Sequence, residues 1–215
     1  RFSGALFAGA GSYCRGGSMS LLTVAQALAR NVGLAVPSVV ATAPQREWSE
    51  AMEMANETGQ EVARRVDWGV LTRVVTSPSV GAFVTLPADF DRMVPGITVR
   101  SGQSILRPLT RPEWGSLITT SGLPRYFLLE GQTITLWPTP VAPVQVTVTY
   151  QSENWITNAT AYVRDTDTAL IDEALIEKGL IARWRRQKGM DYADFEAEYE
   201  AALADRARFD GRSRL

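Results

Sequence analysis

The spacing of hydrophobic residues changes twice along the chain, from helical to alternating and back to helical. The first helical pattern begins at a capping-box pair, Thr23 and Gln26, and ends at Gly33, a residue suited to the left-handed stop of a helix. A second helical stripe covers about residues 44–66 and includes Gly59, where the small residue indicates close packing. These patterns predict two helices in the first third of the chain.

From Asp67 onward the hydrophobic period is two and turn residues multiply, which is typical of β-strands. The clearest strands cover residues 126–129, 133–137 and 144–151. In the last of them valine and tyrosine occupy one face while threonine and glutamine occupy the other. This alternation is expected for a half-buried antiparallel strand.

Helical spacing returns after Asp165 and Asp167, which we interpret as helix-capping residues, and it stops at Gly189. A last helix begins after Asp191 and runs to about Arg208. This order predicts an α+β fold, in which a helical bundle from the N- and C-terminal helices carries an inserted antiparallel β domain. The predicted division of the chain is a flexible or extraneous extension at 1–18, a bundle domain at 19–66 plus 165–208, an inserted β domain at 67–164 and a tail at 209–215.

Composition excludes several kinds of chemistry. The 215 residues include no histidine and one cysteine, and 22 basic residues nearly balance 23 acidic ones. Without histidine there is no Ser-His-Asp triad and no histidine zinc ligand, and a single thiol cannot form an intrachain disulfide. No stretch approaches the roughly 20 consecutive apolar residues that span a bilayer. We therefore expect no enzymatic activity, no cofactor, no metal and no membrane partner.

Three weaker hypotheses rest on side chains that often carry chemistry. Asp165 and Asp167 could begin a calcium loop, but the later ligands and the required glycine are missing. Asp89 and Asp91 could form a carboxylate pair for glycoside cleavage, yet their place in a strand-to-turn segment favours side chains that face water. A carbohydrate-binding β module is an alternative interpretation that rests on aromatic side chains. They are Trp114, Tyr126, Trp137, Tyr150 and Trp155.

Charged residues near the end of the sequence form blocks of one sign. The first basic block contains Arg183, Arg185, Arg186 and Lys188. The acidic block contains Asp191, Asp194, Glu196, Glu198 and Glu200. The second basic block contains Arg206, Arg208, Arg212 and Arg214. Two interpretations stay open: the blocks pair within one chain, or unlike blocks meet across copies in a head-to-tail contact that can close a ring.

A set of short motifs occurs in a defined order along the chain. They are Leu86-Pro87-Ala88-Asp89-Phe90-Asp91-Arg92, Leu106-Arg107-Pro108-Leu109, Glu113-Trp114, Gly122-Leu123-Pro124-Arg125-Tyr126-Phe127, Leu136-Trp137-Pro138-Thr139-Pro140, Val146-Thr147-Val148-Thr149-Tyr150 and the segment 183–192. With these motifs the chain resembles, from about residue 19 to residue 203, the head-to-tail adaptor (connector) proteins of tailed bacteriophages, of the podovirus and siphovirus neck type.

The resemblance implies a structural protein and carries over no catalytic motif. It implies a ring, commonly of twelve copies, that lies under the portal, extends the DNA channel and gives the tail or nozzle an attachment platform. The implied partners are the portal protein, the next neck or tail-tube protein, other copies of the chain and the genomic DNA in the channel. The implied location is the virion neck, after assembly in the host cytoplasm. A role as a minor tail component is the alternative.

The resemblance also suggests which residues meet these partners. Family members often dock an extended C-terminal segment onto the portal, and residues 209–215 occupy the matching place. The expected portal-docking residues are Arg206, Arg208, Phe209, Arg212, Arg214 and Leu215. The first basic block and the acidic block are the expected contacts between neighbouring copies.

Overall fold

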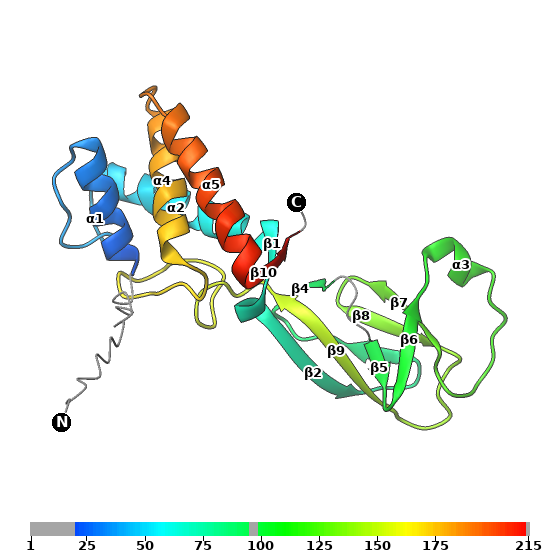
Figure 1. Ribbon diagram of the computed structural model, residues 1–215. Coiled ribbons are helices and arrows are strands. Elements are labelled where there is room, and N and C mark those ends of the chain that lie inside the picture. The colour runs from blue at the N-terminus through cyan, green and yellow to red at the C-terminus, as the bar shows by residue number, and fades with distance from the viewer. Residues whose placement is uncertain (1–19, 95–98, 214–215) are drawn as a thin grey trace, which may run out of the picture.

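The computed structural model describes residues 20–94 and 99–213 and has two parts (Figure 1). The helical part contains α1 (Leu21–Val32), α2 (Arg46–Arg65), α4 (Glu173–Gln187) and α5 (Ala193–Asp210). The β part projects from one end of it. The predicted α+β class is confirmed, and the predicted extension at 1–18 lies outside the described residues.

The helical part has one hydrophobic core, to which all four helices contribute. α4 contacts α1, α2 and α5. Each helix brings a side chain with no exposed surface, and these are Leu28, Val62, Ile176 and Leu203. Gly59 lets α2 approach the loop before α4, because a Cβ atom there would lie 2.3 Å from the Trp155 ring. The close packing predicted at Gly59 is therefore confirmed.

The ends of α1 follow from local sequence, with one correction. Ser20, and not Thr23, is the N-cap. Thr23 is its N3 partner, and the Thr23 hydroxyl accepts a 2.6 Å hydrogen bond from the Ser20 amide. Gly33 ends the helix in the left-handed conformation with φ 76°, as predicted.

The start predicted for α4 is wrong. The helix begins at Glu173, and the carboxylate of its N-cap, Asp172, accepts a 3.1 Å hydrogen bond from the Ala174 amide. Asp165 and Asp167 lie in the preceding loop and cap no helix with their side chains. A carboxylate followed by an apolar pattern predicts a cap, but an Asp in a loop can satisfy other backbone amides equally well.

Most strands of the β part form one curved sheet. They are β2 (Thr72–Pro78), β3 (Phe83–Thr85), β4 (Phe90–Met93), β5 (Val99–Ser101), β6 (Ser104–Pro108), β7 (Tyr126–Glu130), β8 (Thr133–Trp137) and β9 (Gln145–Ser152). The strand order is β2-β9-β5-β6-β7-β8-β3, and β4 also pairs with β9. The end strands β2 and β3 are in contact, so the sheet curves back on itself.

The sheet is not purely antiparallel, which corrects the prediction. β6 and β7 pair in parallel, with Arg107 opposite Tyr126 and Pro108 opposite Phe127. A short helix, α3 (Arg111–Gly115), and a long loop connect the two strands. A parallel pair needs such a crossover, whereas a tight hairpin would force antiparallel pairing.

The β part has its own hydrophobic core on the inner side of the sheet. In β9, Val146, Val148 and Tyr150 are buried as the alternation predicts. Gln151 departs from the alternation and is 1% exposed. Its side-chain nitrogen donates to the Trp68 carbonyl at 3.2 Å and to the Thr72 hydroxyl at 2.8 Å, which offsets the burial of that nitrogen. The side-chain oxygen has no hydrogen-bond partner among the described residues.

A second, small sheet lies where the two parts meet. It pairs β1 (Val66–Trp68), which directly follows α2, with β10 (Gly211–Ser213), which directly follows α5. A short 3₁₀ turn (Gly69–Leu71) leads from β1 into β2. Part of the predicted tail is thus a strand paired within its own chain. We call this region of β1, β10 and β4 the junction.

Candidate interaction surface

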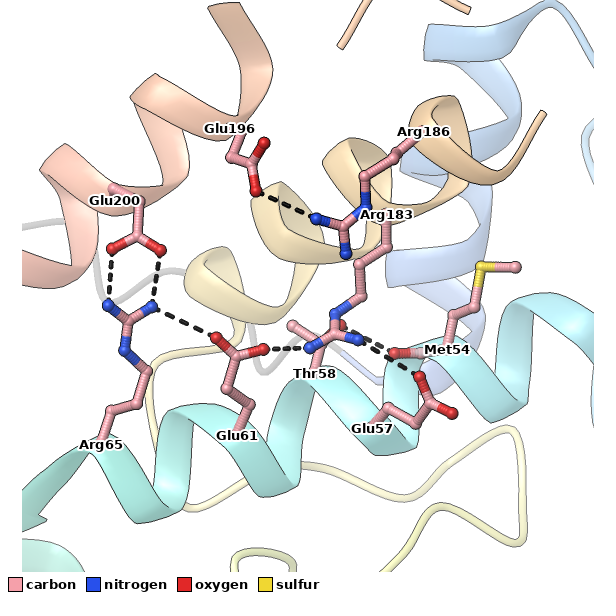
Figure 2. A network of polar contacts seen from close by, with 9 residues as sticks. All are labelled: Met54, Glu57, Thr58, Glu61, Arg65, Arg183, Arg186, Glu196 and Glu200. Atoms are coloured by element: carbon pink, nitrogen blue, oxygen red, sulfur yellow. Dashed lines mark hydrogen bonds and ion pairs between the residues drawn. The ribbon is translucent and has the colours of Figure 1, made fainter. Parts of the chain in front are cut away.

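Ion pairs connect three helices across their outer surface (Figure 2). Arg183 of α4 donates to Glu57 at 3.2 Å and also to Glu61, both on α2. Arg65 of α2 donates to both carboxylate oxygens of Glu200 on α5, at 2.6 and 2.7 Å. Arg65 also donates to Glu61 at 3.2 Å. Glu61 therefore joins the two arginines, and we call these five residues the helical ion network.

The pair of Arg65 and Glu200 is the best-formed contact of the network. Hydrogen bonds from Arg65 hold the pKa of the Glu200 carboxyl below its ordinary value and outweigh the opposing effect of burial. The same contact raises the pKa of Arg65. Because the two side chains are 27% and 47% exposed, we expect the pair to contribute only about 0.5 kcal/mol.

Tyr199 lies close to this network and is buried. Its hydroxyl makes no hydrogen bond of good geometry among the described residues, although Arg65 of the network lies near it. Burial raises the pKa of the phenol to about 12. The hydroxyl therefore stays protonated at neutral pH and contributes no charge to the surface.

The rest of the first basic block also has partners within the chain. Arg186 pairs with Glu196 of the acidic block at 3.2 Å. Lys188 pairs with Glu50 of α2 at 2.6 Å, and hydrogen bonds from Lys188 and then Arg46 lower the pKa of Glu50. The block thus connects α4 to both α5 and α2.

Arg185 is held by three neighbours. It donates to the Asn31 side-chain oxygen at 2.9 Å and to the Asp191 carbonyl at 3.1 Å. Its guanidinium lies 4.0 Å from the centre of the Phe195 ring, a favourable cation–π position. These contacts fix the turn between α4 and α5 against the end of α1.

Residues of the acidic block are divided between paired and outward-facing side chains. Glu196 and Glu200 pair as described, and Glu198 pairs with Lys178. Asp191 and Asp194 are exposed. The structure thus brings the two blocks together within one chain at Arg186 and Glu196. Contacts of these blocks between copies stay a prediction.

The expected portal-docking residues occupy the end of α5 and the junction. Arg206 lies 3.4 Å from Asp172, and Arg208 is exposed. Phe209 is 81% exposed, unusual for so large an apolar side chain. Arg212 lies opposite Asp67 in the pairing of β10 with β1. The last two expected residues, Arg214 and Leu215, lie outside the described residues.

One arginine, which the sequence did not single out for a role, ties the β part to the helical part. Arg92 of β4 donates to Asp67 of β1 at 3.1 Å. It also donates to the carbonyls of Ala63 at 3.2 Å and Val66 at 2.9 Å, at the end of α2. A cation is favourable there, because the last carbonyls of a helix lack partners and carry partial negative charge. In the sequence, only the position of Arg92 within the motif 86–92 could have pointed to this role.

Asp89 and Asp91 do not simply face water, which corrects that expectation. Asp89 accepts hydrogen bonds from the hydroxyls of Tyr150 at 2.9 Å and Ser152 at 2.7 Å. Burial first, and then the contact with Asp89, raise the pKa of Tyr150 to about 12. Asp91 pairs with Arg92 and lies 3.6 Å from Arg64. Asp89 thus joins the segment before β4 to β9, and Asp91 joins β4 to α2.

Asp165 and Asp167 organise loops. The Asp165 carboxylate accepts from the amides of Val40 and Ala41, both at 2.9 Å, and so fixes the connector between α1 and α2. The Asp167 carboxylate accepts from two amides of its own loop at 2.9 and 2.8 Å. Among residues 20–94 and 99–213 no group of three or more acidic or cysteine side chains is placed to hold a metal ion.

The aromatic residues of the carbohydrate hypothesis do not form a common exposed face. Trp155 is 1% exposed and Tyr150 is 4% exposed, so both belong to the cores. Tyr126 and Trp137 lie across from each other on neighbouring strands, with ring centres 5.7 Å apart. Trp114 is on α3. A sugar platform needs exposed rings on one surface, and the five rings do not form one, because Tyr150 and Trp155 are buried in two different cores.

Comparison with known proteins gives one family. A family model described as SU10 adaptor protein matches residues 19–215. A comparison with curated proteins finds no match. None of the described helices is long and apolar enough to cross a membrane. Since the match covers nearly the whole chain, the chain belongs to the SU10 adaptor protein family of phage head-to-tail adaptors, structural proteins of the virion neck.

Proposed function

We propose that this chain assembles as a closed ring of twelve copies between the portal protein and the next neck protein, a nozzle or tail-tube component. The ring extends the DNA channel and forms the attachment platform for the tail. In each copy the residues 19–66 plus 165–208 act as one helical bundle, and the β domain at 67–164 projects from it. The observation that carries the proposal is the family match over residues 19–215.

The charge distribution fits a channel through which DNA passes. The formal net charge of the chain is -1. A ring that neutralised many phosphates would hold DNA by counterion release and slow its movement. Near-neutral subunits avoid this, and the genomic DNA contacts the channel without sequence recognition.

Contacts between copies use the charged blocks. Asp191 is exposed in the turn between α4 and α5, and Asp194 is exposed in the first turn of α5. Arg208 is exposed at the far end of α5. Unlike charges at opposite ends of one helix suit a head-to-tail contact, which closes into a ring when the rotation allows. Assembly in the host cytoplasm precedes attachment to the capsid.

The portal contact uses the end of α5 and the tail at 209–215. The exposed ring of Phe209 can enter an apolar pocket of the portal, while the neighbouring arginines add polar contacts at its rim. Docking then requires the tail to leave β1 or to carry the β1–β10 pair with it.

Light scattering of the chain mixed with the portal of the same phage tests this proposal. We expect a complex with the mass of a ring on the portal. Deletion of residues 209–215 is expected to abolish portal binding and to lower the unfolding temperature of the free chain slightly, because β10 is lost. Deletion of residues 1–18 is the control and should leave binding intact. A chain that stays monomeric with the portal would overturn the proposal. A deletion that lowers portal binding and stability equally would mean that the tail is part of the core and not a docking arm.

A further inference from the structure

The last strand, β10, pairs with β1 over three residues, at the place where the two parts of the molecule meet (Figure 1). The opposite residues are Val66 with Ser213, Asp67 with Arg212 and Trp68 with Gly211. Among the described strands, β1 is the one partner of β10. A ribbon of two short strands is at best marginally stable in water without support from other contacts. Residues 211–213 are therefore held by a contact that opens at a small cost in free energy.

β1 is held in place by contacts that do not involve β10. Arg92 of β4 donates to the Val66 carbonyl at 2.9 Å. The Trp68 indole donates to the Val62 carbonyl of α2 at 2.8 Å, and the Trp68 carbonyl accepts from Gln151 of β9 at 3.2 Å. Val66 and Trp68 also belong to the hydrophobic core of the helical part. Because these contacts come from α2, β4 and β9, β1 keeps its place when β10 leaves.

α5 is also fixed before the tail begins. Leu203 and Ala207 are buried in the core of the helical part. Phe209, two residues beyond Ala207, is exposed. Gly211 then begins β10, and it has no Cβ atom to limit the rotation of its backbone. The chain thus passes from an anchored helix, through a residue suited to a hinge, to a strand that is held by one short pairing.

Two ways of docking the tail onto the portal differ in what happens to β1. If the β1–β10 pair moved as a unit, β1 would lose its hydrogen bonds to Arg92 and Gln151, and Trp68 would leave the core. β1 is also continuous with α2 at one end and leads through the 3₁₀ turn into β2 at the other, so both would have to move with it. If β10 leaves alone, the three-residue pairing is lost and the other contacts of β1 remain. The geometry therefore favours the departure of β10 alone.

We propose that β10 is a latch, which holds the docking tail against β1 in the free chain and opens when the chain meets the portal. This inference rests on the proposed function, because it adds a regulatory step to the proposed portal contact. In the closed state, the backbone groups of residues 211–213 that pair with β1 cannot bind the portal. The apparent affinity for the portal is then reduced by the fraction of chains in which the latch is open. The tail becomes accessible where the portal competes with β1 for it.

A disulfide across the β1–β10 pair tests the latch. Val66→Cys and Ser213→Cys replace residues that lie opposite each other, in a chain in which Cys14→Ser removes the one native cysteine. Binding to immobilised portal is measured with and without dithiothreitol. We expect the oxidised variant to unfold at the same temperature as the reduced one or higher. Its affinity for the portal should be lower by about tenfold or more, because a linked tail cannot leave β1.

Thr76→Cys with Thr147→Cys, again with Cys14→Ser, is the matched control. The two hydroxyls lie 2.9 Å apart across β2 and β9, so a disulfide there links strands of the sheet and leaves the tail free. Oxidation of this control should leave portal binding unchanged, and an equal loss of binding in both disulfide variants would overturn the latch.

Two further results would also overturn the latch. Equal portal binding by the oxidised and reduced forms of the chain with Val66→Cys and Ser213→Cys would show that the tail docks without leaving β1. Failure of this disulfide to form in the folded free chain would show that β10 does not lie on β1. A wild-type chain that does not bind the portal at all would instead overturn the proposed function.

Discussion

The helical part and the β part have separate hydrophobic cores, but their surfaces differ. Across the helices, ion pairs such as Arg65 with Glu200 and Arg186 with Glu196 cover the outside. In the β part, long segments carry no charge and aliphatic side chains such as Val141 face water. Charged surfaces orient partners and tolerate water, whereas apolar surfaces bind by excluding it. The difference teaches that one chain can finish two hydrophobic cores with different surfaces, one covered by ion pairs within the chain and one with long uncharged loops.

The tightest packing should be found in the helical part, and Gly59 tests it. In Gly59→Ala the new Cβ atom would lie 2.3 to 2.6 Å from atoms of the Trp155 ring, so backbone or ring must move. We expect the free energy of unfolding in urea to fall by about 3 kcal/mol. Gly115→Ala is the control, since no atom lies within 4 Å of its Cβ position, and a similar loss in both would contradict the packing argument.

The connection between the two parts should depend on Arg92. Arg92→Met removes the donor to Asp67, whose side chain is 3% exposed, and to two carbonyls at the end of α2. We expect a loss of about 2 kcal/mol in urea unfolding, because buried acceptors lose their charged partner. In the exposed pair of Arg111 and Glu130, Arg111→Met should lose less than about 0.5 kcal/mol. Equal losses would mean that Arg92 is not a special link.

Substitution of one buried tyrosine in each part compares how well the two parts satisfy a buried hydroxyl. In the β part, Tyr150→Phe removes the 2.9 Å hydrogen bond to Asp89, and we expect a loss of about 1 kcal/mol. In the helical part, Tyr199→Phe removes a buried hydroxyl that makes no hydrogen bond of good geometry and lies near Arg65, so stability should change by less than in Tyr150→Phe. The two thermal unfolding curves decide the matter, and a clear loss in Tyr199→Phe would reveal a partner for that hydroxyl.

The smallest effect should depend on pH and belong to the helical surface. The pKa of Glu200 is below its ordinary value of 4.5 in the folded chain. Its contribution to stability is therefore present above that ordinary value and is lost as the pH falls through the lowered one. We expect Glu200→Gln to lose about 0.5 kcal/mol near pH 7, and the difference from wild type to vanish in strong acid.

Urea titrations near pH 7 and in strong acid measure the free energy of unfolding of Glu200→Gln and of the wild-type chain. Glu53→Gln is the control, because Glu53 is exposed and makes no ion pair among the described contacts. A difference for Glu200→Gln that persists unchanged into acid would contradict the role given to the pair with Arg65.

Local patterns predicted much of the fold. The stripe around Gly59, the stop at Gly33 and the strands within 126–151 all follow from the spacing of apolar residues and from turn chemistry, which are properties of neighbours in sequence. The start of α4 was predicted too early, since Asp165 and Asp167 are suited to caps but are used by loop amides. The sequence shows that a carboxylate can accept hydrogen bonds, but it does not show which backbone amides will donate them.

Contacts between distant segments escaped prediction. The parallel pairing of β6 with β7 depends on the path of the long connection between them. Nothing in the sequence distinguishes Arg92 from the other arginines, because its contact with the end of α2 forms only in the folded chain. The loops at 79–82, 116–124 and 138–144 lie far apart in sequence, and backbone hydrogen bonds join them only in the folded chain. The exposure of aliphatic residues in these loops, such as Val141, can likewise be read only from the folded chain.

The pairing of β10 with β1 has a mechanical consequence. Antiparallel hydrogen bonds attach residues 211–213 to β1, and Asp67 of β1 is in turn held by Arg92 of β4. A pull on the last described residues is therefore transmitted across the β1–β10 pair to Asp67 and Arg92, in addition to running back along α5. The contacts that join the two parts thus share any load applied to this end of the chain.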